Sequence, residues 1–150
     1  MWEISGLPLH VLVVHATVVL TPLAALVAIV YACWPKYRDW LRWPTAAAAV
    51  IAVVLVWAAY LSGNNFFSSS RFDHFSGAIL DRIHTHQSYA RTLRWIATAF
   101  GVVTLVAVWL HSRTGRTRAV LSVLVVVGAV LTLVWTFLTG EAGARAVWGT

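Results

Sequence analysis

Four long apolar stretches dominate this chain of 150 residues and leave little choice of fold. They cover residues 7–33, 44–62, 92–112 and 119–139, and about 20 apolar residues suffice for a helix to cross a bilayer. Of all residues, 60% are hydrophobic and 11% are charged, whereas a soluble domain carries about a quarter charged residues. We therefore expect an all-α polytopic membrane protein, in which residues 1–150 form a single four-helix transmembrane bundle.

The basic residues predict which ends of the helices face the cytoplasm. Short loops rich in Lys and Arg stay on the cytoplasmic side. The two short segments between apolar stretches hold Lys36, Arg38 and Arg42, and Arg113, Arg116 and Arg118. We therefore expect an N-out, C-out protein of the bacterial plasma membrane. The net charge of +6 is divided between the two sides of the membrane, so it gives no reason to expect nucleic-acid binding.

Small and polar residues recur at helical spacing along each apolar stretch and predict the faces that pack inside the bundle. The third helix should begin well before its apolar stretch, near Ala78, and the second should end at residues 63–65. No repeat with a period of tens of residues is recognisable. The predicted inner faces are His10, Thr17, Thr21, Ala24 and Ala28; Thr45, Ala49, Ala52, Ala59 and Gly63; His84, Gln87, Arg91, Arg94, Ala97, Gly101, Thr104, Val108 and His111; and Ala129, Thr132, Thr136, Thr139 and Gly143.

Histidines mark the most promising place for chemistry, because a titratable side chain in a membrane helix is costly. His10 and His15 lie in the first apolar stretch, and His84 and His86 precede the third. Imidazole is a common metal ligand and binds haem iron axially, so we expect His10, His15 and His84 to line one metal site. The alternative is that these histidines hydrogen-bond one another, Asp81 or helix-end carbonyls.

Helix geometry limits which of these histidines can act together. On a regular helix His10 and His15 point about 140° apart. If Leu7 and Trp95 lie at the same depth, His15 and His84 are too far apart to bind one iron, and His10 with His84 is closer.

The cofactor that these residues suit best is a b-type haem, which two histidines from different helices can hold in a bundle core. We expect its binding site to involve all four histidines together with Arg91 and Arg94. The two guanidinium groups would meet haem propionates, a lipid phosphate or a quinone head group, unless they are exposed at the interface. We interpret His111 as a marker of the cytoplasmic interface and His74 as a solvated loop residue. Cys33 is the only cysteine, so thiolate clusters are excluded.

The opening residues 6–10 (GLPLH) with His15, the start of the third helix at His84 and the tail 139–148 together resemble the bacterial membrane protein family called domain of unknown function 2231. The resemblance covers essentially the whole chain, and the tail is similar to that of actinobacterial members. Val11 replaces a proline common in the family, and Glu141 stands where many members have His or Asp. Some members are fused to cytochrome c-like or Rieske-type domains, which implies outward-facing electron transfer by analogy.

Two hypotheses of function follow. In the first, the chain is a small membrane redox protein that binds haem near its outer face and exchanges electrons with a quinone or an outer-face redox protein. In the alternative, it is a non-enzymatic membrane module that binds a metal ion, a lipid head group or a protein partner, with a homo-oligomer as one option. A transporter is disfavoured because no charged path crosses the midplane, and a hydrolase because no catalytic motif is present.

Cysteine labelling tests the predicted topology, after Cys33 is replaced by serine. A membrane-impermeant maleimide added to intact cells should label cysteines introduced within residues 68–70 or at Ala144. It should not reach cysteines within residues 113–118, because this dense basic segment is expected in the cytoplasm. Labelling of that segment in intact cells would show that the bundle is inverted.

Overall fold

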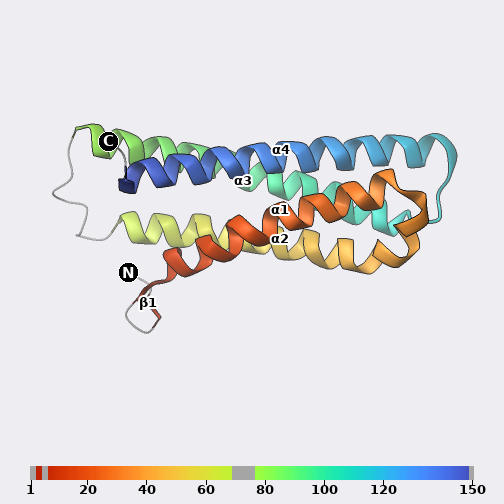
Figure 1. Cartoon of the computed structure of the whole chain (residues 1–150), viewed down its shortest axis with the longest axis horizontal. Coiled ribbons are helices and arrows are strands. Elements are labelled where there is room, and N and C mark those ends of the chain that lie inside the picture. The colour runs from red at the N-terminus through yellow and green to blue at the C-terminus, as the bar shows by residue number, and fades with distance from the viewer. Residues whose placement is uncertain (1–2, 5–6, 69–76, 149–150) are drawn as a thin grey trace.

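The computed structural model describes residues 3–4, 7–68 and 77–148 and confirms the four-helix transmembrane bundle (Figure 1). In this part of the chain the long helices are α1 (Leu9–Cys33), α2 (Arg38–Phe67), α3 (Ala78–Trp109) and α4 (Gly115–Trp148). All four are long and apolar enough to cross a membrane. A short 3₁₀ helix, η1 (Pro35–Tyr37), joins α1 to α2, and the strands β1 (Glu3–Ile4) and β2 (Leu7–Pro8) pair before α1.

Helix boundaries follow the sequence closely, with one correction. The third helix begins at Ala78, as predicted. The second does not end at residues 63–65 but continues to Phe67, so that prediction was wrong. Gly63 packs against an imidazole and keeps a helical backbone, because tertiary contacts override weak local preferences. His74 and most of the serine loop lie outside the described residues.

Successive helices run in opposite directions, and the bundle has two distinct ends (Figure 1). Helix α1 packs against α2 and α4, and α3 packs against the same two helices, so α1 and α3 lie diagonally opposite. We call the end where α1 and α3 begin, and where α2 and α4 finish, the His10 end. The other end holds the connections from α1 to α2 and from α3 to α4, and we call it the Tyr31 end.

Most of the predicted small-residue faces form the core, but the first part of the α3 face does not, because His84 and Arg91 are exposed. Along its length the core consists mainly of Ala, Gly and Thr, which let the helix backbones approach closely. Some buried threonines return their hydroxyl hydrogen to their own helix: Thr132 donates to the carbonyl of Gly128, and Thr139 to that of Trp135. The largest fully buried side chains are Tyr31 and Phe100, which fill the half of the bundle nearer the Tyr31 end.

The two hairpins, α1 with α2 and α3 with α4, share one burial pattern, so the chain contains an internal structural repeat. Every buried residue of α1 has a buried counterpart in α3 that lies 76 positions later, as Ala107 follows Tyr31. Five of the seven buried residues of α2 have a buried counterpart in α4 that lies 80 positions later, as Val125 follows Thr45. The other two, Arg38 and Leu41, correspond to the half-buried Arg118 and Leu121. The pairs in α1 and α3 are Thr17 and Leu93, Thr21 and Ala97, Ala24 and Phe100, Ala25 and Gly101, Ala28 and Thr104, Tyr31 and Ala107, and Ala32 and Val108.

The repeat is not recognisable in the sequence, and the burial pattern of the helices reveals it. Few equivalent residues are identical, because close packing demands small side chains and not particular ones. The identical pairs include His10 and His86, Arg38 and Arg118, Ala49 and Ala129, and Gly63 and Gly143. Since both hairpins run in the same direction, a pseudo-two-fold axis runs along the bundle.

Glycine substitution tests the close approach of α2 and α3. A Cβ at Gly101 would lie 2.5 Å from Cγ2 of Val53, a short and stiff side chain. We expect Gly101→Ala to destabilise the bundle by about 1–3 kcal/mol, the usual penalty for overpacking. Unfolding by dodecyl sulfate in mixed micelles measures the loss of folding free energy.

Gly140→Ala is the matched control, because a Cβ there meets nothing within 4 Å. Its stability should stay equal or rise by up to about 1 kcal/mol, as alanine is the better helix former. Equal destabilisation by both substitutions would contradict the packing that we describe.

Candidate functional site

His10 lies on the first turn of α1 and is held by the last turns of α2. Its Nδ1 lies 3.0 Å from the carbonyl oxygen of Ala59 and 3.3 Å from Oγ of Ser62. The ring stacks on Phe66, with centroids 6.1 Å apart. The edge of the ring also faces Gly63, where a Cβ would lie 2.9 Å from the imidazole Cε1. The glycine therefore allows the ring to lie directly against the α2 backbone.

His86 repeats this arrangement between α3 and α4. Its Nδ1 lies 2.9 Å from the carbonyl oxygen of Thr139. A Cβ at Gly143 would lie 3.0 Å from the Cε1 of this imidazole. Under the internal repeat His86 is equivalent to His10, Thr139 to Ala59 and Gly143 to Gly63. Each hairpin thus presents one half-buried imidazole, anchored to a backbone carbonyl beside a glycine.

The two imidazoles meet near the pseudo-two-fold axis at the His10 end. Their ring centroids are 6.5 Å apart and their planes are inclined at 67°. A ring that donates its Nδ1 hydrogen to a carbonyl carries a lone pair on Nε2, the tautomer of histidines that bind metals. Among the described residues the hydrogen bonds of both rings go through Nδ1 alone, so both Nε2 atoms are available for a ligand.

The other predicted site residues lie elsewhere. His15 is exposed, and its Nδ1 lies 2.6 Å from the carbonyl oxygen of Val11 in its own helix. His84 is exposed as well and contacts the ring of Phe67, with centroids 5.7 Å apart. The structure therefore brings together His10 and His86, and it does not bring His15 or His84 to them.

Arg94 and Arg91 belong to an aromatic cluster between α2 and α3. The Arg94 guanidinium lies 4.2 Å from the ring centre of Tyr60 and 5.1 Å from those of Trp57 and Trp95. Arg91 is exposed and also interacts with Tyr60. Cation–π contacts of this kind stabilise an arginine at a membrane interface. These contacts direct the Arg94 guanidinium to the α2 face of the bundle.

Residues 3–4, 7–68 and 77–148 form no metal site from protein ligands alone. No group of three or more His, Cys, Asp or Glu side chains there could hold a metal ion. The arrangement of His10, His15 and His84 as three ligands is therefore not assembled. The structure instead brings two imidazoles together, those of His10 and His86.

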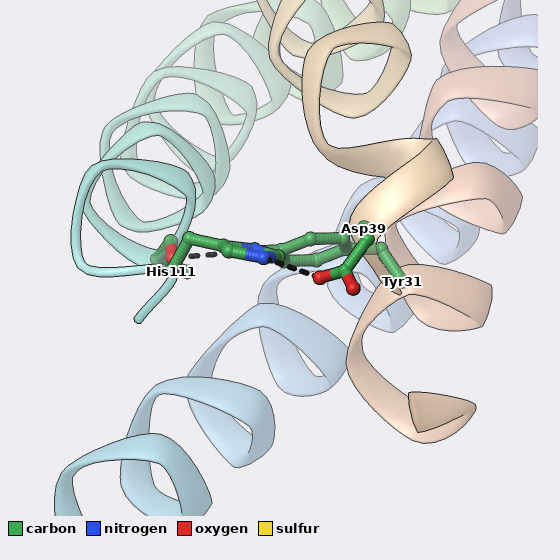
Figure 2. Close-up of polar contacts among 4 residues, drawn as sticks. Tyr31, Asp39 and His111 are labelled. Atoms are coloured by element: carbon green, nitrogen blue, oxygen red, sulfur yellow. Dashed lines mark hydrogen bonds and ion pairs between the residues drawn. The ribbon is translucent and has the colours of Figure 1, made fainter. Parts of the chain in front are cut away.

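The opposite end contains a polar chain that the sequence did not reveal (Figure 2). The buried Tyr31 hydroxyl donates to the carbonyl oxygen of Ala107 at 3.1 Å and lies 3.1 Å from Nδ1 of His111. Nε2 of His111 in turn lies 2.8 Å from Oδ1 of Asp39. We interpreted His111 as a mere interface marker, but it links α1, α2 and the turn after α3. No local motif could have predicted contacts between residues so far apart in the chain.

The comparisons with known proteins identify a family and no closer relative. The family model described as "Predicted membrane protein (DUF2231)" matches residues 6–150. No curated protein and no solved structure matches the chain. Function must therefore be argued from the site itself.

A double-mutant cycle tests the contact between His10 and Gly63. Gly63→Ala should push the imidazole away from the Ala59 carbonyl and destabilise the bundle by about 1–2 kcal/mol. In a His10→Ala background the same substitution should have little effect, because no ring remains to be displaced. Unfolding in mixed micelles gives the stabilities of the wild type, the two single variants and the double variant.

The repeat supplies an independent copy of this experiment. Gly143→Ala should behave in the same way with His86→Ala, because a Cβ there meets the second ring at almost the same distance. If Gly143→Ala destabilises the bundle equally after the imidazole is removed, the clash is with the helix backbones and not with the ring.

Proposed function

The chain belongs to the DUF2231 family of predicted membrane proteins, and we propose that it is an integral membrane redox protein that holds a b-type haem between His10 and His86. One observation carries the proposal. Two imidazoles from diagonal helices are each anchored through Nδ1 to a backbone carbonyl, at 3.0 Å and 2.9 Å, and keep Nε2 for a metal. The bundle makes this arrangement twice, once in each hairpin.

The number of protein ligands favours haem over a bare metal ion. Structural zinc takes four protein ligands and catalytic zinc takes three, and the described residues hold no such group. Haem iron needs only two axial ligands, because the porphyrin supplies the other four. The separation of the rings also fits, since two metal–nitrogen bonds of about 2 Å place the ring centres roughly 6 Å apart, against 6.5 Å here.

The neighbouring helices support the same interpretation. At the level of the two rings α2 carries Gly63 and α4 carries Gly143, so neither helix places a side chain over the imidazole edge. The neighbouring core consists mainly of small residues, which let the helix backbones approach the two rings closely. Bis-histidine haem supplies one-electron transfer with a potential set by burial and nearby charge.

Position in the membrane suggests the partner. If the basic short loops are cytoplasmic, the His10 end lies at the outer face of the plasma membrane. A haem there would exchange electrons with a quinone in the outer leaflet or with an outer-face redox protein. The alternative is a membrane module without haem, in which the two histidines bind a metal ion or only join the helices.

Absorption spectra of the purified protein test the proposal. The chain is expressed with added haem precursor, purified in mild detergent and, where needed, reconstituted with haemin. We expect a Soret band of a low-spin, bis-imidazole haem. His10→Ala and His86→Ala should each lose most of the bound haem, because each removes one axial ligand.

His15→Ala and His84→Ala are the matched controls and should keep haem at the wild-type level, since His15 bonds within its own helix and His84 contacts Phe67. A colourless wild type after reconstitution would rule out the redox protein. If metal analysis then found one copper or zinc per chain, lost in the His10 and His86 variants, the metal-ion module would take its place.

A further inference from the structure

Arg38 is a buried cation at the Tyr31 end with unused hydrogen-bond donors. It is the first residue of α2, and only 5% of it is exposed. Its guanidinium lies over the ring of Tyr31, 4.9 Å from the centre. Within the described part of the chain, its buried Nε and Nη1 have no hydrogen-bond partner. Buried donors are normally paired, and an unpaired charged one is especially costly.

Further positive charge converges on the same place. Arg42, one turn along α2, and Arg118, the equivalent of Arg38 in α4, both interact electrostatically with Tyr31. The Nε of Arg42 is also buried without a partner in the described residues. In addition, α2 and α4 both begin at this end, and helix N-termini add positive potential.

The nearest acidic side chain does not neutralise this charge. Asp39 follows Arg38 in the chain, but its side chain is 94% exposed and its carboxylate pairs with His111. The three arginines therefore converge on Tyr31, and two of them, Arg38 and Arg42, keep buried donors without a partner in the described residues. An anion with several acceptor oxygens would satisfy them.

We propose that Arg38, Arg42 and Arg118 bind an anionic phosphate group at the Tyr31 end of the bundle. Guanidinium groups match the oxygens of a phosphate in pairs, and the resulting hydrogen bonds are among the strongest in proteins. Exposed Trp40 and Trp43 flank the site on α2, and tryptophans of this kind lie at the depth of lipid head groups. A phospholipid head group and a free phosphate ion both present this chemistry. The proposal does not depend on haem.

Stabilisation by ligand provides the test, because a ligand that binds only the folded state raises the unfolding midpoint. The full chain is unfolded thermally in neutral detergent at fixed ionic strength, followed by tryptophan fluorescence. Micelles are doped with phosphatidylglycerol or with zwitterionic phosphatidylcholine, and inorganic phosphate is titrated separately. We expect phosphatidylglycerol or phosphate to raise the midpoint and phosphatidylcholine to have little effect, because its choline cation opposes the arginines.

Substitutions locate the effect. Arg38→Gln should raise the half-saturating ligand concentration about tenfold, since it removes charge-assisted hydrogen bonds to the phosphate. Arg116→Gln is the control, because this exposed arginine at the same end has equal charge and should bind as wild type does. If Arg38→Gln does not fold, Arg118→Gln replaces it, with the same expected weakening.

The result separates the two sources of phosphate and can overturn the proposal. Stabilisation by phosphatidylglycerol alone identifies a lipid site, and stabilisation by inorganic phosphate identifies a site for a free ion. No stabilisation of the wild type by either ligand overturns the proposal. So does equal weakening in the Arg38 and Arg116 variants, which would show that only overall charge matters.

Discussion

A helix inside a bilayer must find partners for its polar side chains within the protein, because lipid offers none, and most of this structure follows from that requirement. Thr132 and Thr139 bond back to their own helix. His10 and His86 bond to carbonyls of the neighbouring helices, and Tyr31 bonds across the bundle to α3. Several other buried polar atoms have no partner among the described residues, and those of Arg38 belong to a cation. A buried charge is the costliest group to leave unpaired, and Arg38 is therefore where we propose a ligand.

The internal repeat explains why the two histidines meet. Two equivalent hairpins packed around a common axis bring equivalent residues together wherever they face that axis. His10 and His86 occupy such a position, each with its carbonyl and its glycine. A site on a pseudo-symmetry axis receives one ligand from each half, which is the ligand set of a bis-histidine haem. Away from such sites, equivalent residues of the two hairpins need not be identical, because small side chains of any kind can pack the core.

The two ends of the bundle have different chemistry although their helices are equivalent. At the His10 end, two imidazoles meet near the axis, and each is bonded through Nδ1 to a backbone carbonyl. At the Tyr31 end, arginines gather around a phenol and a histidine–aspartate pair. If the basic loops are cytoplasmic, electron transfer would belong to the outer face and phosphate binding to the inner one. The two proposed sites would then lie at opposite faces of the membrane.

The sequence by itself determined the class of protein, the four helices, the early start of α3 and the inner face of each helix, because hydropathy and the helical period are local properties of the chain. Only the tertiary structure decided that His86, not His84, lies beside His10. From the sequence, an equal depth of Leu7 and Trp95 was only a condition, whereas the repeat aligns Thr17 with Leu93 and so puts His10 level with His86. The relative depth and rotation of distant helices depend on how their surfaces pack. That packing also created the contacts of Tyr31 with His111 and Arg38, which no spacing along the chain encodes.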